Sequence, residues 1–449
     1  MNALTAPGFP EEQVRARARH GTAEVFPHPA TYGARLFGPS PAAAPPQDDL
    51  DRARVVPPVF MPQRLEKLID LAREPEFGDV DLTTRAGGLT ARLPLYLSAF
   101  GSTRAGSGDL ALHASRQAAR LGIPMVIGEN MIPVHGYRRA DDTTRSALLA
   151  RVEAYLEAAP EGTGGVVVQQ STEDADSEVW NLLYSDPATR PLLETGRLAF
   201  ELKTGQGAKP GLGGMTVVGR EEAARLARRF TVQEVFGPDD DHRLRCATPG
   251  TFTDEILRQQ LRFMRNNFPR ARTWVKFHPG RDIAHAARTA WAAGADAVTV
   301  DGAEGGTGWA PGVFLDQVGL PLAECLRRIG RPAGCLLATG GMWEGGRVLR
   351  ALALGATAVG LGRAALIAVD EDPEHGLERL ADSIALELRL LISALGKYTV
   401  TGLDADDLWW PADPATTASA DPAHPADDRS GDVSGDRSGA QAGAPEGTS

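Results

Sequence analysis

Cysteine is scarce in this chain, which has three among 449 residues: Cys246, Cys325 and Cys335. None of them stands in a C-x-x-C spacing or in another spacing typical of metal ligands. The sequence therefore predicts no metal site of that kind. A protein with so few cysteines is typical of a reducing compartment, and we expect a cytoplasmic protein.

Long apolar runs and an excess of positive charge are also missing. No apolar run reaches the ~20 residues that a membrane-spanning helix needs, and residues 1–10 lack the charged-then-apolar order of a signal peptide. The formal net charge is -11 and the pI is near 5.4. Both values argue against nucleic acid or an anionic membrane as a partner, so we expect a small-molecule substrate.

The two ends of the chain differ in composition from its middle. Residues 1–60 are rich in proline and alanine, and we predict an irregular N-terminal arm with one short helix at residues 11–20. Residues 411–449 have no aromatic or long aliphatic cluster to bury, which predicts a disordered C-terminal tail. The folded domain is therefore expected at residues 61–410.

The middle of the chain alternates between strand-like runs and helical patterns. Eight βα units in succession predict an α/β fold with a single (β/α)₈ TIM barrel, whose site lies at the C-terminal face of the strands. Residues 206–272 form a long insertion after the fourth strand, with helical patterns at 221–229 and 254–268, and their position suggests a lid. The predicted strands are residues 93–100, 125–128, 165–169, 199–203, 273–277, 297–300, 334–338 and 358–362.

The stretch Phe200–Met215, FELKTGQGAKPGLGGM, joins the fourth strand to a glycine-rich loop. Lys203, Gln206 and Lys209 lie where the strand ends, which is where barrels place groups that contact a ligand. Two lysines close together favour an anionic ligand. The alternative is a solvated glycine loop with surface lysines.

Two other charged residues stand at predicted strand ends. Lys276 lies inside the apolar strand Trp274–Phe277, where a buried ammonium group needs an anion or a reduced cofactor to compensate its charge. Glu129 follows the second strand and is either a functional carboxylate or a structural ion-pair partner. His278 is equally consistent with a proton relay and with a core histidine.

These motifs resemble the FMN-binding synthase domain of the glutamate synthase family. The resemblance rests on K-x-x-Q-G-A-K-P-G-x-G-G at residues 203–214, on Glu129, on Lys276, on the Asp301–Gly308 turn with Pro311, and on the glycine pairs that end strands seven and eight. It implies that Lys203, Gln206 and Lys209 hold 2-oxoglutarate over FMN, that Glu129 assists proton transfer, and that Lys276 lies against the flavin N1/O2 edge. The implied FMN contacts are Ser98, Ala99, Phe100, Gly101, Gln169, Lys276, Asp301, Gly302, Gly305, Gly306, Thr307, Gly340, Gly341, Gly360, Gly362 and Arg363.

The sequence also departs from the family pattern. Thr339 replaces an aspartate, and Asn130 and Met131 replace two glycines. Residues 365–410 contain no cysteine, so we expect no iron–sulfur cluster. The chain starts Met1-Asn2-Ala3, without an N-terminal nucleophilic cysteine, so we expect no glutaminase activity.

The resemblance implies an FMN-dependent oxidoreductase of amino-acid metabolism that acts on the C–N bond of glutamate or a close relative, by glutamate biosynthesis or by redox-neutral amine exchange. Two alternatives remain open: another FMN barrel enzyme, of the isomerase or 2-hydroxy-acid oxidase type, or a non-catalytic barrel subunit of an amidotransferase. A separate glutaminase, an electron-donor protein and a homo-oligomer remain open as partners.

Overall fold

The structure is a computed structural model of the whole chain. It describes residues 4–36, 48–100, 109–128, 142–171, 177–209, 216–228, 230–246, 252–306 and 310–411. The chain divides into two units, Met1–Trp410 and Pro411–Ser449, and the barrel with its helices belongs to the first. Apart from Pro411, the tail predicted to be disordered lies outside the described residues.

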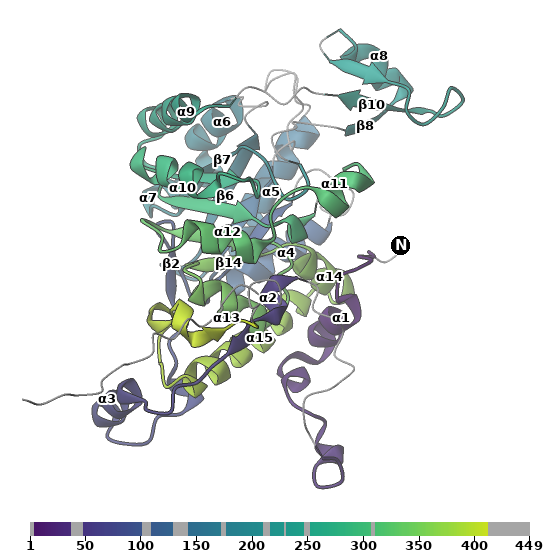
Figure 1. Cartoon of the computed structure of the whole chain (residues 1–449). Helices are drawn as coiled ribbons and strands as arrows, with labels where there is room; N and C mark the ends of the chain where they lie inside the picture. The colour runs from purple at the N-terminus through teal and green to yellow at the C-terminus, as the bar shows by residue number, and fades with distance from the viewer. Residues whose placement is uncertain are drawn as a thin grey trace, which may run out of the picture. The chain divides into compact units, whose positions relative to one another are not determined.

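Eight parallel strands close into a barrel (Figure 1), so the predicted TIM-barrel fold is confirmed. Each strand pairs with the next one of the barrel along the chain, and the last, β14, pairs with the first, β4. The strands are β4 (Leu95–Phe100), β5 (Pro124–Ile127), β6 (Gly165–Ser171), β7 (Leu198–Lys203), β11 (Arg272–Phe277), β12 (Ala297–Asp301), β13 (Leu336–Thr339) and β14 (Ala358–Leu361).

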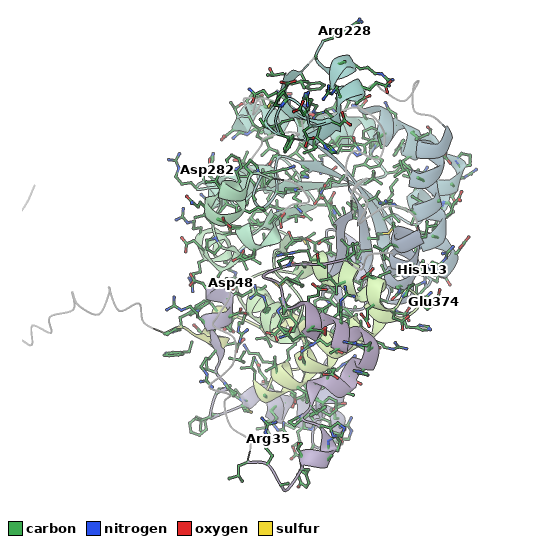
Figure 2. The ribbon with its side chains drawn as sticks, turned by 90° about the vertical axis from the view of Figure 1, so that its right-hand side faces the viewer. Arg35, Asp48, His113, Arg228, Asp282 and Glu374 are labelled. Atoms are coloured by element: carbon green, nitrogen blue, oxygen red, sulfur yellow. The ribbon has the colours of Figure 1, made fainter. Side chains whose placement is uncertain are left out.

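Helices follow every barrel strand, as the alternating pattern predicts. They are α4 (Asp109–Arg120), α5 (Asp142–Ala158), α6 (Ser177–Ser185), α7 (Arg190–Glu194), α9 (Asp254–Asn267), α10 (Ile283–Ala292), α11 (Gly312–Gln317), α12 (Leu322–Ile329), α13 (Gly345–Ala353), α14 (Arg363–Glu371) and α15 (Gly376–Ala394). Short 3-10 helices occur at Gly21–Val25, Pro29–Thr31, Phe77–Asp79, Pro187–Thr189, Ala303–Gly305, Val400–Gly402 and Ala405–Asp407. His113 on α4 pairs with Glu374 between α14 and α15, and the two side chains lie together in Figure 2.

The side chains of each barrel strand alternate between two environments, because successive residues of a strand point to opposite faces. In β7, Leu198, Phe200 and Leu202 pack in the core between the barrel and its helices. Ala199 points inward and joins a separate interior cluster that includes Trp274 of β11. The same alternation carries the polar residues of β7 into the barrel interior.

A small hairpin made of β2 (Thr84–Ala86) and β3 (Leu89–Ala91) packs against the apolar end of the barrel interior. Leu89 is buried in the interior cluster, and the indole nitrogen of Trp274 donates a hydrogen bond of 3.1 Å to the carbonyl of Gly87. Polar groups of the interior must therefore be sought toward the carboxyl ends of the strands.

The N-terminal segment contributes to the same core. The predicted helix forms as α1 (Glu11–His20) and lies beside α14 and α15 (Figure 1). Val14 and Ala18 are fully buried there, and Arg15 makes ion pairs of 3.0 Å with Asp370 and Glu371. This helix is held to the barrel by an apolar stripe and by charge pairs.

A second contact of the N-terminal segment is made by α2 (Asp49–Arg52). Arg347 on α13 is 1% exposed and pairs with Asp48 and Asp51, and Asp48 is labelled in Figure 2. Next to α2, β1 (Arg54–Val55) pairs with β15 (Leu408–Trp409), and α3 (Pro62–Leu71) follows without a buried residue.

The insertion after β7 contains more structure than the sequence indicated. The two expected helices form as α8 (Arg220–Leu226) and α9, but a three-stranded antiparallel sheet accompanies α8, in the order β8 (Thr216–Gly219), β10 (His242–Cys246), β9 (Thr231–Gln233). The segments that join it to the barrel include residues outside the described ranges, so its role as a lid stays a prediction. Among the described residues, no helix is both long and apolar enough to cross a membrane.

Candidate active site

Charged and polar side chains gather in the barrel interior toward the carboxyl ends of the strands. They reach this place because they share the inward parity of their strands. The set consists of Ser98 of β4, Gln169 of β6, Glu201 and Lys203 of β7, Lys276 of β11, Thr299 and Asp301 of β12, and Thr339 of β13, all of which are buried.

Lys276 has an anionic partner within the protein. Its Nζ lies 3.2 Å from Oδ2 of Asp301, and both side chains are about nine-tenths buried. The other oxygen of Asp301 accepts a hydrogen bond from the hydroxyl of Thr339, and Oδ2 also accepts from the backbone N–H of Gly207 at 3.2 Å. The sequence predicted that an anion or a reduced cofactor compensates the charge of Lys276, and Asp301 is one anion beside it. An aspartate in place of Thr339 would put a second carboxylate beside Asp301.

Glu201 is a second buried carboxyl, and it is not among the site residues predicted from the sequence. Its Oε2 accepts a hydrogen bond of 2.5 Å from Gln169, and its Oε1 accepts one of 2.8 Å from Thr299. Burial raises the pKa of Glu201, although Lys276 and Lys203 act in the opposite direction. The signal in the sequence was its spacing: Glu201 stands two residues before Lys203 and therefore points to the same side of the strand.

The central loop folds back on itself directly after β7. Lys203 donates a hydrogen bond to the side-chain oxygen of Gln206, and the backbones of Gln206 and Lys209 exchange two hydrogen bonds of 3.1 and 2.8 Å. A Cβ atom on Gly207 would lie 2.7 Å from the carbonyl oxygen of Gly306. Only glycine fits at position 207, and the close approach joins the β7 loop to the β12 loop.

The loops after β13 and β14 are those to which the resemblance assigns a phosphate. Helix α14 begins after Gly362 without a side-chain cap, which leaves the N–H groups of its first turn without that partner. Arg363, the first residue of α14, donates to the carbonyl oxygen of Glu304, and its guanidinium lies 4.6 Å from the ring centre of Phe9. The guanidinium is thus already held by two protein groups.

Gly360 is required for a steric reason. A Cβ atom at this inward position of β14 would lie 2.5 Å from Cγ2 of Thr339 and 2.7 Å from Cζ of Tyr96. We expect Gly360→Ala to lower the free energy of unfolding by about 1–3 kcal/mol, the usual cost of overpacking. Urea denaturation measures this loss. Gly312→Ala is the matched control, since a Cβ atom there meets nothing within 4 Å; an equal loss in both variants would contradict the steric reason.

Glu304 has a structural role beside this loop. Both of its carboxyl oxygens accept from the backbone N–H of Leu322, at 3.1 and 3.0 Å, and so cap the start of α12. Burial, together with the nearby Asp48, raises the pKa of Glu304 from 4.5 to about 7.

This pKa predicts a pH dependence of stability. Because the folded state binds the proton of Glu304 more tightly than the unfolded state, stability falls as the pH rises from about 4.5 to about 7. Glu304→Gln keeps an oxygen acceptor for Leu322 and removes the titration. We expect urea midpoints at pH 5 and pH 8 to differ less in this variant than in the wild type, whereas Glu66→Gln on the exposed side of α3 should leave the wild-type difference unchanged.

Some predicted site residues cannot be placed. Gly101, Glu129 and Thr307 lie outside the described residues, so their roles stay predictions. Of the others, Ala99 is half-buried at the end of β4, and Gly302 and Gly305 belong to the turn after β12. His278 follows β11, and its buried Nδ1 has no hydrogen-bond partner among the described residues.

Lysine is rare in this chain, and three of its lysines belong to this site. The chain contains 47 basic residues of the lysine and arginine types, and its lysines are Lys67, Lys203, Lys209, Lys276 and Lys397. Lys203 and Lys276 face the interior from neighbouring strands, at paired positions of β7 and β11, and Lys209 follows in the loop after β7. Three of the five lysines, each of which offers a compact point charge, thus stand at this face of the barrel.

Comparison with known proteins identifies the region that carries these residues. Residues 189–371 match the family described as conserved region in glutamate synthase. A glutamate synthase large subunit-like protein of Rhizobium meliloti is 33% identical over 236 residues, which cover 50% of this chain and 48% of that protein. An archaeal glutamate synthase (NADPH) of Methanocaldococcus jannaschii is 33% identical over 250 residues, or 46% of this chain and 47% of that protein.

Solved structures show a similar fold. An oxidised active mutant of (S)-mandelate dehydrogenase aligns with a TM-score of 0.51 at 20% identity, over 89% of this chain and 99% of the other. A flavocytochrome b2 variant with sulfite bound aligns with a TM-score of 0.51 at 18% identity, over 85% and 84%. This chain spans about half the length of the curated relatives described above. The match to the conserved region in glutamate synthase lies at residues 189–371, which include β7, β11, β12, β13 and β14.

Proposed function

We propose that this protein is an FMN-dependent oxidoreductase that acts on the C–N bond of glutamate or of a close relative. The observation that carries the proposal is the convergence of Lys203 and Lys276 at the carboxyl ends of two paired strands, inside the region shared with glutamate synthases. Two buried ammonium groups at one barrel mouth fit an anionic ligand and a cofactor that gains negative charge.

Three features of the residues present fit FMN. The hydroxyl of Ser98 is buried and has no hydrogen-bond partner among the described residues, so it can bond to a ligand at the mouth. The uncapped start of α14 suits a phosphate. The part of the barrel interior away from the carboxyl ends of the strands is filled by apolar side chains, so the site is closed on that side.

Each group of the site then has a role. The bound flavin supplies hydride transfer. Lys203, Gln206 and Lys209 hold the carboxylates of the substrate, since two cations and an amide can make charge-assisted hydrogen bonds to a dicarboxylate. Lys276 would supply positive charge to the cofactor, and Asp301 orients Lys276 through their 3.2 Å contact. Glu129 assists proton transfer in this scheme.

The reaction itself can follow either of two routes. In the first, an imine of 2-oxoglutarate is reduced to glutamate with electrons from a reduced pyridine nucleotide or a partner protein. In the second, glutamate and another amine exchange to give an N-substituted glutamate without an external electron donor. Both routes need the same residues to bind the dicarboxylate. The site therefore supports a dicarboxylate substrate and is compatible with either route.

A visible spectrum of the purified protein, followed by anaerobic mixing with glutamate, tests the proposal. We expect FMN at one per chain, no stoichiometric iron, and bleaching of the flavin by glutamate or a spectral shift with 2-oxoglutarate. (S)-Mandelate serves as the comparison substrate, because the solved structures of similar fold include (S)-mandelate dehydrogenase. A colourless protein, or bleaching by the hydroxy acid and not by glutamate, would overturn the proposal.

A further inference from the structure

Glu201 can hold a proton without any movement of the heavy atoms of its hydrogen-bond partners. The amide nitrogen of Gln169 can only donate, and it donates to Oε2 of Glu201 at 2.5 Å. The hydroxyl of Thr299, 2.8 Å from Oε1, can either donate or accept. If Oε1 is protonated, the hydroxyl reverses and accepts. The same two hydrogen-bond partners, Gln169 and Thr299, therefore suit both the carboxylate and the neutral acid.

The ionisable groups of the cluster around Glu201 come from four strands. Lys203 shares β7 with Glu201 and Lys276 lies on β11, and both act on its carboxyl group. Asp301 of β12 is paired with Lys276. The fourth neighbour is Tyr96 of β4, whose pKa is raised well above its usual value, first by burial and then by the charges of Glu201 and Asp301. With both carboxylates ionised, two cations balance two anions. Protonation of Glu201 leaves the cluster with one net positive charge.

We propose that Glu201 is a redox-linked proton site: its carboxylate takes up a proton from solvent when the bound flavin gains a negative charge, and releases it when that charge leaves. The proposal rests on the proposed function, because it requires a bound flavin.

The atoms and charges balance. The C–H bond of the substrate amine breaks and supplies a hydride, which is one hydrogen with two electrons, so the substrate is oxidised and the cofactor is reduced with one added negative charge. One solvent proton then forms an O–H bond on Glu201. The total charge of cluster and cofactor stays constant.

The burial of Glu201 favours the uptake of a proton when the flavin is reduced, because a buried carboxylate is poorly solvated. At 2% exposure, desolvation already holds the pKa of Glu201 above its ordinary value in the presence of two lysines. A further negative charge nearby raises this pKa again, as a like charge does for any carboxyl. At pH values between the pKa of Glu201 with oxidised flavin and its pKa with reduced flavin, one proton binds for each flavin reduced.

Redox-difference infrared spectroscopy of the FMN-loaded protein tests the inference. We expect the wild type to gain a protonated-carboxyl band on reduction, and Glu201→Gln to lack it. The flavin potential should also fall more steeply with rising pH in the wild type than in Glu201→Gln. The difference in slope should correspond to the uptake of up to about one additional proton for each two electrons. Glu344→Gln is the matched control, since Glu344 is a half-buried carboxyl whose pKa is also raised by burial, but it stands at the N-cap position of α13, outside the barrel.

Thr299→Val supplies a second test that retains Glu201. Loss of the donor to Oε1 disfavours the carboxylate, so Glu201 should be protonated before reduction and the redox-linked band should disappear. This variant decides the matter if Glu201→Gln does not fold. Equal bands and equal pH slopes in the wild type and Glu201→Gln would overturn the inference while leaving FMN binding intact. Absence of FMN from the wild type would instead overturn the proposed function.

Discussion

Replacing Lys276 by methionine is expected to lower the free energy of unfolding by about 3 kcal/mol, the lower end of the cost of breaking a buried ion pair. Methionine fills a similar volume, so the loss comes from charge: Asp301 stays buried, and its donors among the described residues are then the hydroxyl of Thr339 and the N–H of Gly207. In the FMN-loaded protein, the same variant should have a lower flavin potential and weaker sulfite binding, since a positive charge that would stabilise the reduced cofactor has been removed.

A double-mutant cycle separates the ion pair from other effects of the substitution. Asp301→Asn alone should also destabilise the apoprotein, because it removes the negative charge 3.2 Å from the buried ammonium of Lys276. The double variant Lys276→Met/Asp301→Asn should lose less stability than the sum of the two single variants. Strict additivity in urea denaturation would show that the two side chains do not act as a pair. An unchanged flavin potential in Lys276→Met would place the lysine away from the cofactor.

Lys209→Ala is expected to raise the dissociation constant for 2-oxoglutarate by roughly 10²-fold, because a hydrogen bond to a charged group contributes about 1.5–3 kcal/mol. The backbone hydrogen bonds between Gln206 and Lys209 do not depend on the side chain, so the loop should keep its shape. The FMN content should not change. Titration of the flavin spectrum with 2-oxoglutarate measures the effect directly.

The matched control for this prediction is Lys67→Ala, which removes a lysine from α3 rather than from the barrel mouth. A change within about 0.5 kcal/mol is expected there, as for most surface substitutions. If Lys209→Ala behaves like Lys67→Ala, the dicarboxylate is not held by this loop. The proposal of FMN binding would then stand without its substrate class.

The sequence by itself determined the barrel. Period-two alternation in FELK separates Phe200 and Leu202, which pack outward, from Glu201 and Lys203, which point inward, and eight such strands with intervening helical patterns predict closure. The strand ends then determine which residues share one face, so the sequence alone assigns Lys203, Lys276 and Asp301 to a common site. Local patterns suffice for this assignment because parity and strand order are local properties of the chain.

Only the tertiary structure decided how these groups are paired. Lys276 forms an ion pair with Asp301 on the neighbouring strand, and Glu201 accepts a hydrogen bond from the hydroxyl of Thr299, 98 residues away in the sequence. Arg347 meets Asp48 across 299 residues, which joins the N-terminal segment to the barrel. No periodic pattern encodes such contacts, because they depend on which side chains come within hydrogen-bond distance when the barrel closes. A buried charge is stabilised by the polar or oppositely charged groups that closure brings next to it.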